Sequence, residues 1–554
     1  KYEFTGQMSA FSGLEMMAEG PISKSNNSSF VTSYRYGIAS LAATGTSAIP
    51  YYQDLSFKAN FGNTKMGKFE LFGLGGLSSI DFKGDEVDEG DLFANPATDA
   101  YVDNRLGVLG LTHLLRIDKT TFVKSALGWS TNQNDYTQDN LIRNDQDEII
   151  NKYLATEVSN QEYRYTFNTS ITKKFSARWN MKAGYLGELY DANFFTSDRD
   201  NRVSIPDENN DSIPDYFISV IDLKDQYYLH QAYAQAEYNA SDKLSLTAGF
   251  HTQHLNLNNR TSVEPRFGMS YQVTPNQRLS LAYGLHAQML PAPILFLETE
   301  NEAGEYIRTN EQLDFMKSHH FIVGYDRNLG TDWRLKAEGY YQRLFNIPVE
   351  SIASSYSIIN EGADFVFDNR ADLVNEGTGT NYGIELTLEK FFSNDYYLLL
   401  TTSLYESTYK GSDGVSRSTA FNNQYVANIL FGKEWKFGKD DNNAWTFDTK
   451  LTTSGGKPYT PVDLAATRAN DGREVRFEEI AFSERYEDYL RWDVKFGVRL
   501  NSAKKSISHQ FFVDLQNVSN RQNEFVRRYN EVTDEINSVK QIGFFPDVMY
   551  RIQF

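Results

Sequence analysis

A nine-residue stretch with clustered oxygen side chains carries the strongest local chemical signal in the sequence. It reads DENNDSIPD and runs from Asp207 to Asp215. Asp207, Asn209, Asp211 and Asp215 occupy its positions 1, 3, 5 and 9. This spacing resembles that of the side-chain ligands in calcium-binding loops, because hard cations prefer clustered oxygen atoms. The pattern therefore predicts a calcium site in a long loop.

Two features of this stretch depart from the usual calcium loop. Ser212 stands at position 6, where such loops carry glycine, and no glutamate stands at position 12. An acidic, solvated loop is therefore the alternative interpretation. Bound calcium would stiffen an extracellular loop without catalysing a reaction, and the sequence requires no other cofactor.

Histidines form the second candidate group, and the chain has only eight of them. By strict alternation, His251, His286 and His320 fall on the polar faces of three strands, near their outer ends. They are predicted to line one patch, where they could contact a ligand or a metal ion. The plainer interpretation, which the sequence favours, is three ordinary histidines bonded to their neighbours. His254 lies three positions after His251, so these two side chains point to opposite faces and cannot chelate together.

The remaining polar residues do not form a pattern that predicts an enzyme. No Ser/His/Asp set or carboxylate pair with catalytic spacing is recognisable. The chain has no cysteine, which excludes disulfides, Cys-ligated zinc and a thiol nucleophile. Its net charge is −19, so nucleic acid is not expected as a partner, because phosphate binding requires a basic surface.

The elements that carry these residues are predicted to be β-strands, because apolar and polar residues alternate strictly along most of the chain. Trp492, Val494 and Phe496 share one face of a segment, whereas Asp493 and Lys495 share the other. A period of two residues is typical of a strand with one apolar and one polar face. The high content of Tyr and Phe, 35 and 38 residues, also favours β structure.

The connections between these segments alternate between short and long. Residues 240–242 and 330–332 are short and rich in turn formers, whereas 134–160 and 193–223 are predicted to be long loops. In an antiparallel meander this alternation places every long loop at one end and every tight turn at the other. We count about 22 strands, from 2–10 and 13–20 at the start to 541–554 at the end.

Such a pattern predicts a transmembrane protein without transmembrane helices. No run of even ten apolar residues occurs, and a spanning helix needs about 20. A closed sheet instead pairs every backbone amide within the membrane and alternates lipid-facing with lumen-facing side chains. The expected fold is an all-β, antiparallel outer-membrane β-barrel with long extracellular loops and short periplasmic turns. A soluble pair of β domains or a propeller is the alternative, but we find no repeat of about 40–50 residues, which a propeller would show.

The last segment supports this interpretation. Val548, Tyr550, Ile552 and Phe554 alternate with polar or flexible residues, and the sequence ends on Phe554. Outer-membrane proteins commonly end in such an aromatic-closed strand, which the outer-membrane insertion machinery reads. An ordinary strand that happens to end in phenylalanine is the alternative.

Several strand-and-turn motifs resemble those of TonB-dependent outer-membrane receptors. The closest branch is the one whose members often carry an N-terminal carboxypeptidase-regulatory-like domain. The motifs are YEFTGQ and GLEMMAEGPISK within 2–24, NEGTGTNYGIELTLEKFF at 375–392, SGGKPYTPVDL at 454–464, FVDLQNVSNRQN at 512–523 and GFFPDVMYRIQF at 543–554. The resemblance covers essentially the whole chain, and Gly20-Pro21 resembles the first periplasmic turn of such barrels.

The resemblance implies a cell outer membrane location and energised uptake of a scarce or bulky ligand, such as a siderophore, vitamin, glycan or peptide. In that family an inner-membrane TonB complex acts on a plug inside the barrel. Residues 1–554 are expected to form the barrel alone, without the plug or the TonB box. The alternative function is a receptor-like barrel that serves as a structural or docking subunit for surface lipoproteins. A passive porin is disfavoured, because porins usually have about 16–18 strands.

Overall fold

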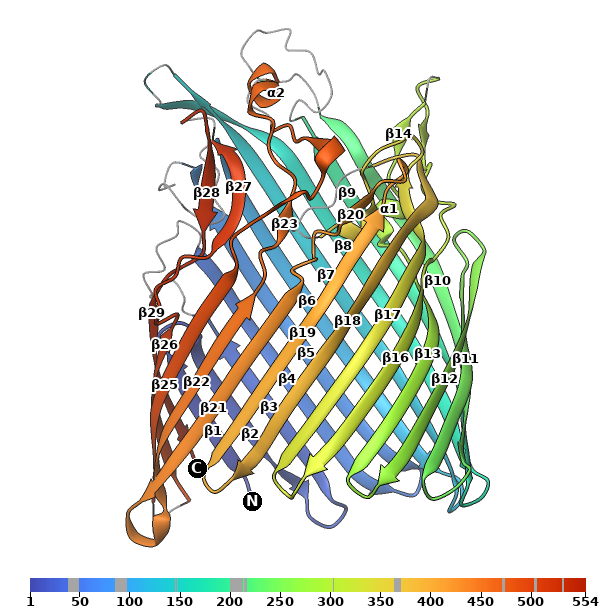
Figure 1. The fold of residues 1–554 in the computed structure, drawn as a ribbon, viewed down its shortest axis with the longest axis vertical. Coiled ribbons are helices and arrows are strands. Elements are labelled where there is room, and N and C mark those ends of the chain that lie inside the picture. The colour runs from blue at the N-terminus through green and yellow to red at the C-terminus, as the bar shows by residue number, and fades with distance from the viewer. Residues whose placement is uncertain are drawn as a thin grey trace.

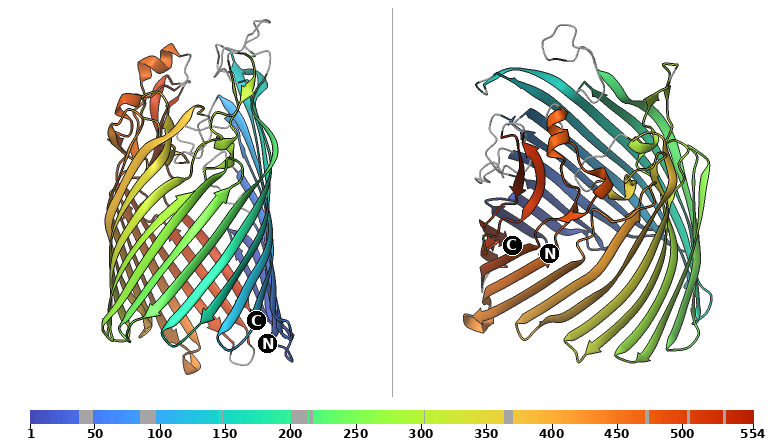
Figure 2. Two further views of the ribbon diagram at one scale, coloured as in Figure 1. Left: turned by 90° about the vertical axis from the view of Figure 1, so that its right-hand side faces the viewer. Right: turned by 45° about the horizontal axis from the view of Figure 1, so that its top comes forward.

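The chain forms one closed antiparallel β-barrel, seen from the side in Figure 1 and from two further directions in Figure 2. The computed structural model describes residues 1–37, 49–84, 97–144, 146, 148–199, 213, 217–301, 303–362, 370–470, 474–502, 506–530 and 533–554. The main sheet holds 23 strands, and the three-residue β20 pairs only with β19, so 22 of the described strands make the ring. This architecture confirms the predicted all-β barrel of about 22 strands.

The ring strands follow the chain order around the barrel. The first half comprises β1 Glu3–Ser9, β2 Gly13–Ser23, β3 Ser28–Tyr36, β4 Ile49–Thr64, β5 Gly67–Phe82, β6 Thr98–Arg116, β7 Thr121–Arg143, β8 Ile149–Lys174, β9 Trp179–Asp198, β10 Ile218–Asn239 and β11 Leu244–Leu255. The second half comprises β12 Arg260–Thr274, β13 Gln277–Gln288, β16 Met316–Leu329, β17 Trp333–Glu350, β18 Leu373–Ser393, β19 Tyr396–Lys410, β21 Tyr425–Phe437, β22 Asn443–Ser454, β25 Tyr489–Asn501, β26 Ser508–Gln516 and β29 Phe545–Gln553.

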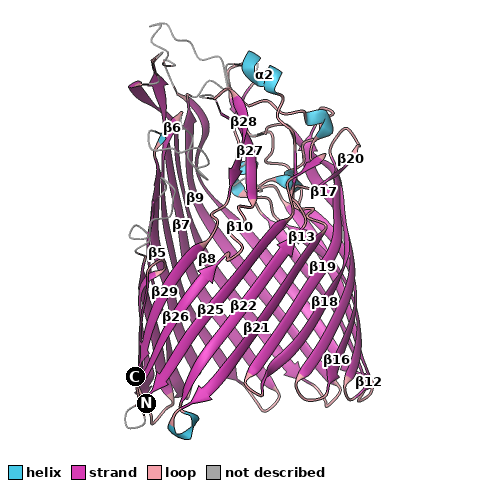
Figure 3. Cartoon of the chain, turned by 60° about the vertical axis from the view of Figure 1, so that its left-hand side comes forward, coloured by secondary structure: helices cyan, strands magenta, loops and turns pink. Residues whose placement is uncertain are grey.

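The remaining elements are short and lie mainly at the end of the barrel that carries the long loops, which we call the mouth (Figure 3). They are α1 Ala292–Leu295, α2 Leu464–Ala469, the 3₁₀ turns η3 Ile358–Asn360, η4 Lys439–Asp441 and η5 Glu478–Ile480, and the strands β14 Thr299–Glu300, β15 Tyr306–Ile307, β20 Ser416–Ser418, β23 Pro458–Tyr459, β24 Glu484–Arg485, β27 Glu524–Asn530 and β28 Glu535–Lys540. None of the described helices is long and apolar enough to cross a membrane.

The first and last strands close the barrel. Gly6 pairs with Ile552 and Met8 pairs with Tyr550 in an antiparallel register. Because the number of ring strands is even, both termini lie at the end opposite the mouth (Figure 1). The predicted terminal strands are confirmed to within four residues at each boundary, although Gly20 and Pro21 lie inside β2 and not in a turn.

A buried side-chain contact reinforces this seam near the mouth. Ser9 donates to both carboxylate oxygens of Asp547, at 2.8 and 3.0 Å, and the backbone amide of Phe11 donates to Asp547 Oδ1 at 3.2 Å. The side chain of Ser9 is almost fully buried, at 1% exposure. Asp547 therefore supplies the acceptor for a hydroxyl group that water hardly reaches.

Asp547→Ala is expected to lower the free energy of unfolding by about 1–3 kcal/mol, because it leaves the buried Ser9 hydroxyl without its acceptor. The midpoint of urea unfolding in detergent measures this change. Gln553→Ala, on the same face of β29, is the control and should change the free energy of unfolding by less than about 0.5 kcal/mol. An unchanged midpoint for Asp547→Ala would mean that the backbone ladder alone holds the seam.

The prediction of a long loop at 134–160 is wrong, because β7 and β8 continue as one tall hairpin through most of it. Thr137 pairs with Glu157 and Asn140 pairs with Tyr153. Residues 130–140 of β7 carry no aliphatic side chain on either face, so the alternation that marks a membrane-spanning strand disappears there. The backbone ladder nevertheless continues, because water on both sides accepts polar side chains while the amides still pair. Similarly, β9 and β10 occupy both ends of the predicted loop 193–223.

The best-packed core lies in the mouth and not at mid-height. The segment that contains α1 folds inward against β9 and β10, where Leu295 and Phe296 are 2% and 0% exposed. The ring of Phe296 lies 5.7 Å from that of Tyr227 on β10. Apolar burial of this kind stabilises a loop that would otherwise be solvated, and it narrows the mouth on one side.

Candidate functional site

The predicted calcium ligands Asp207, Asn209, Asp211 and Asp215 lie outside the described residues. The calcium site therefore stays a prediction.

The three predicted histidines come from neighbouring parts of the lumenal wall. His251 lies on β11, His286 on β13 and His320 on β16, and all three border one hollow of about 510 Å³. His254, in contrast, lies on the outer face of β11 and contacts Thr261 at 2.9 Å. The structure thus brings the three side chains together, and their contact with a ligand remains a prediction.

Small residues create this histidine-lined hollow. Gly249, Gly268 and Gly284 lie on three adjacent strands, and Arg266 stands between Gly249 and Gly284 in the register. A Cβ atom at Gly284 would lie only 2.6 Å from Nε2 of His286. Glycine at position 284 therefore leaves the space in which the imidazole of His286 lies against the wall.

A continuous band of polar side chains crosses the inner wall from β8 to β12 and ends at the hollow. We call it the lumenal polar band; its members are Arg164, Glu188, Gln231, His251, Glu264 and Arg266. Gln231 donates to Glu188 at 2.9 Å, and its amide oxygen lies 3.0 Å from Nε2 of His251. Sequence alternation places each member on the polar face. It does not reveal these contacts, because they join residues of different strands and depend on how the strands are aligned.

Glu264 is the most buried member of the band, at 1% exposure. It accepts hydrogen bonds from Gln253 at 2.8 Å, Ser262 at 2.9 Å and Arg266 at 3.0 Å. Nδ1 of His251 lies 3.0 Å from the same carboxylate. A buried carboxylate is tolerated only when it is paired and hydrogen-bonded in this way. The sequence gives no signal for this site, since the four partners are spread over 16 residues and two strands.

The lumenal polar band is joined to the packed loop of the mouth. Gln253 also donates to the backbone oxygen of Ala287, at 2.8 Å, directly before that loop begins. Within the loop region the fully buried Asn310 donates to the backbone oxygens of Ile294 and Arg370, at 3.2 and 2.7 Å. The loop is therefore fixed both to the wall and to the neighbouring connection before β18.

A second cavity, of about 770 Å³, lies within the mouth between the connections that follow β17, β19 and β22. We call it the mouth cavity. Its wall combines the aromatic side chains of Tyr409 and Phe482 with charged groups of both signs. Such a mixture of apolar surface and a few fixed polar groups is typical of small-molecule sites.

The charged groups of the mouth cavity are held in pairs. Arg417 is 7% exposed and contacts the carboxylate of Asp413 at 2.7 Å and the backbone oxygen of Glu479 at 3.2 Å. The hydrogen bonds from Arg417 hold the pKa of Asp413 below its usual value, so this pair stays ionised at neutral pH. Glu478 accepts a hydrogen bond from Ser355 at 2.8 Å. The cavity thus presents pre-oriented charges from two different connections, those after β19 and β22.

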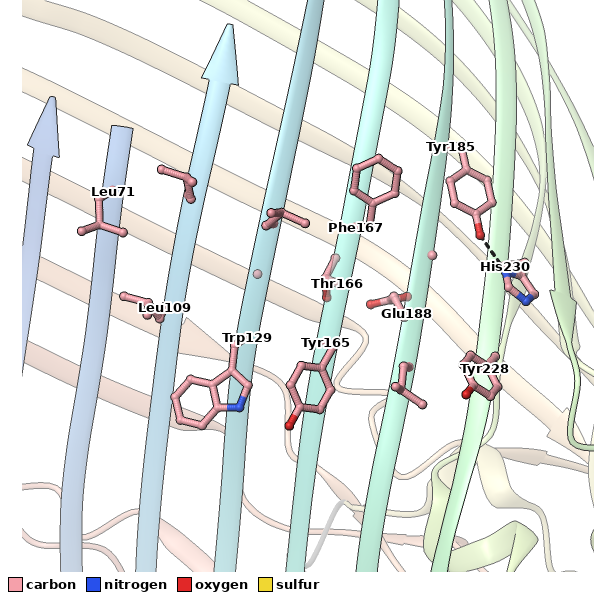
Figure 4. A pocket seen from close by; sticks show the side chains of 15 residues that line it. Leu71, Leu109, Trp129, Tyr165, Thr166, Phe167, Tyr185, Glu188, Tyr228 and His230 are labelled. Carbon is pink, nitrogen blue, oxygen red and sulfur yellow. Dashed lines mark hydrogen bonds between the residues drawn. The ribbon is translucent and has the colours of Figure 1, made fainter. Parts of the chain in front are cut away.

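A third hollow, of about 540 Å³, lies on the outer face of the wall over β5 to β10 (Figure 4). Trp129, Tyr165, Phe167 and Tyr185 line it, and the Tyr185 hydroxyl is 2.7 Å from Nδ1 of His230. It forms where Gly187 stands between Phe167 and His230 in the register. Its apolar lining suits contact with hydrocarbon, as expected for the membrane-facing side of a barrel.

The sequence matches a family model described as TonB dependent receptor-like, beta-barrel, over residues 33–518. The chain belongs to the TonB-dependent receptors. This assignment agrees with the closed 22-strand barrel and places the receptor in the outer membrane of Gram-negative bacteria. The mouth is accordingly its extracellular end, and the tight turns lie in the periplasm.

Solved structures give the same fold at low sequence identity. The ferric-catecholate import receptor Fiu from Escherichia coli K12 aligns with a TM-score of 0.68 and 11% identity over 100% of this receptor and 81% of Fiu. The ferric yersiniabactin uptake receptor FyuA from Yersinia pestis aligns with a TM-score of 0.67 and 11% identity over 100% of this receptor and 80% of FyuA. The siderophore receptor PiuA from Acinetobacter baumannii aligns with a TM-score of 0.65 and 12% identity, over 100% and 82% of the two chains. No curated protein matches the sequence.

Proposed function

We propose that this receptor takes up a bulky, siderophore-like ligand through its mouth, with energy from a TonB complex. The mouth cavity is the observation that carries the proposal. It offers about 770 Å³ and fixed charges of both signs at the extracellular end of a wide barrel. The structural similarity to ferric-siderophore receptors supports this ligand class.

Barrel size gives a second argument for an energised transporter. A ring of 22 strands encloses a lumen too wide for its own side chains to fill, and barrels of this size are plugged transporters. Uptake then requires a plug on which TonB acts, and residues 1–554 supply the barrel. The membrane lipid and the insertion machinery are the other expected partners.

Transport assays with the full-length receptor test this function. The receptor would be expressed in a strain without its own siderophore receptors and offered radiolabelled ferric catecholate, hydroxamate and mixed siderophores. We expect uptake of at least one of them that stops when the TonB gene is deleted. Absence of TonB-dependent uptake for every class would contradict the proposed ligand class.

Arg417→Gln is expected to weaken apparent ligand affinity in this assay by roughly five- to tenfold, because it removes a buried, charge-paired donor from the mouth cavity. Arg468→Gln is the matched control, since Arg468 on α2 also pairs with an aspartate, Asp534 at 2.8 Å, but this pair is exposed and lies outside the cavity. The ligand concentration that gives half-maximal uptake measures both variants. Equal effects of the two substitutions would mean that the mouth cavity does not bind the transported ligand.

A docking role for surface lipoproteins is the second candidate function. The structural comparisons do not favour it, because the similar structures are siderophore receptors. Co-purification of stoichiometric lipoproteins without any transported ligand would reverse this preference.

A further inference from the structure

His286 and His320 form the closest histidine pair in the described part of the chain. Gly284 pairs directly with His320, and Nε2 of His286 lies 2.6 Å from the position that a Cβ atom of Gly284 would take. The imidazole of His286 therefore lies along its own strand, beside the side chain of His320. The two ring centroids are 4.5 Å apart, and the ring planes are inclined by 46°.

These two rings differ from the other histidines in their partners. His230, His254 and His319 each contact a hydroxyl group of Tyr185, Thr261 or Tyr283, at 2.7 to 3.1 Å. Within the described residues, neither His286 nor His320 makes a hydrogen bond through its ring. Both rings border the histidine-lined hollow, so an ion or ligand in the lumen can reach this pair.

The separation of the rings fits a shared metal ion. Imidazole nitrogen binds divalent transition metals at roughly 2.0–2.1 Å, and the ring centre lies about 1.1 Å further out. Two such ligands at an angle of about 90–110° would place their ring centres roughly 4.5–5.2 Å apart. The observed 4.5 Å lies at the lower end of this range. We propose that His286 and His320 chelate one divalent transition-metal ion, such as Zn²⁺, Ni²⁺ or Cu²⁺, on the lumenal wall.

The surrounding charges permit a cation at this place. Arg266 borders the same hollow, but its guanidinium contacts the buried carboxylate of Glu264 at 3.0 Å, so the pair is close to neutral. No group of three or more metal-ligating side chains is found within the described residues. The site is therefore a two-histidine site, whose remaining coordination positions are left to water or to a ligand in the lumen. We expect it to bind metal more weakly than the four-ligand sites of structural zinc proteins.

Metal titration of the purified, untagged barrel in detergent tests the proposal. Chelator-treated protein would be titrated calorimetrically with Zn²⁺ and Ni²⁺, and Cu²⁺ binding would be followed by electron paramagnetic resonance. We expect one saturable site and a Cu²⁺ spectrum with coupling to two imidazole nitrogens. His286→Ala and His320→Ala should each weaken binding by at least about tenfold, since each removes half of the protein ligands.

His319→Ala is the matched control, because His319 is the sequence neighbour of His320 but lies on the outer face, bonded to Tyr283. It should leave metal affinity unchanged. The heat-dependent mobility of the folded barrel on gels shows whether each variant is folded, and His286→Asn and His320→Asn replace any alanine variant that is not. Absence of saturable binding in the wild type, or equal loss in His319→Ala, would overturn the proposal and leave His286 and His320 as a ring contact only. Because the assay uses no transported ligand, its result is independent of the proposed uptake.

Discussion

Glu264→Leu is expected to lower the free energy of unfolding by about 2–4 kcal/mol, because two buried hydrogen-bond donors lose their acceptor. The substitution removes the acceptor shared by Gln253, Ser262 and Arg266, and it leaves the side chains of Gln253 and Ser262, which are 5% and 3% exposed, without that acceptor. Removal of one partner from such a network costs more than the network contributes in total, because the remaining groups stay desolvated.

The urea midpoint of the barrel in detergent measures this loss, and Glu264→Gln should recover part of it because the amide oxygen still accepts. Glu385→Leu is the matched control, since Glu385 also faces the lumen but is exposed. If both leucine variants unfold at the same urea concentration, the lumenal polar band does not stabilise the wall. The same experiment shows whether the mouth loop depends on the band, because Gln253 contacts both Glu264 and Ala287.

Phe167→Arg is expected to destabilise the membrane-inserted barrel by about 2–4 kcal/mol, because it places a cation on the lipid-facing side. Phe167 is 45% exposed on the outer face of β8, within the hollow shown in Figure 4. Its sequence neighbour Asn168 points to the lumen, so Asn168→Arg is the matched control and should cost less than about 1 kcal/mol.

Folding into phospholipid vesicles, followed by tryptophan fluorescence and gel mobility, measures both variants. The difference in stability between Phe167→Arg and Asn168→Arg shows directly which face of β8 contacts hydrocarbon. Equal stability of the two arginine variants would contradict the assignment of the faces and, with it, the membrane orientation of β8.

The membrane-spanning part of the fold could be predicted from the sequence, because there the environment differs between the two faces of each strand. Trp492, Val494 and Phe496 face outward and alternate with Asp493 and Lys495, as their period of two residues predicts. The upper hairpin of β7 and β8 could not be predicted, since residues 130–140 of β7 are polar on both faces and give no periodic signal. Alternation therefore reports the solvent around a strand more directly than it reports the strand itself.

The candidate sites show a similar division. Alternation was sufficient to place His251, His286 and His320 on one side of the wall, because the face follows from position along a strand. It could not reveal the contact between His286 and His320, which depends on the register of β13 with β16 and on the absence of a side chain at Gly284. The mouth cavity was also missed, because Asp413, Arg417 and Glu478 come from connections that show no pattern in the sequence.

The seam between β1 and β29 bears on how the cell must make this molecule. Ser9 and Asp547 meet across 538 positions, so the ring can be completed only after β29 has been synthesised. A ribosome-bound chain at any earlier moment has exposed edges that invite pairing with other chains. The strands from β1 to β26 therefore have to stay unaggregated until β29 can pair, and a chain truncated before Phe545 would leave an open sheet without its closing strand.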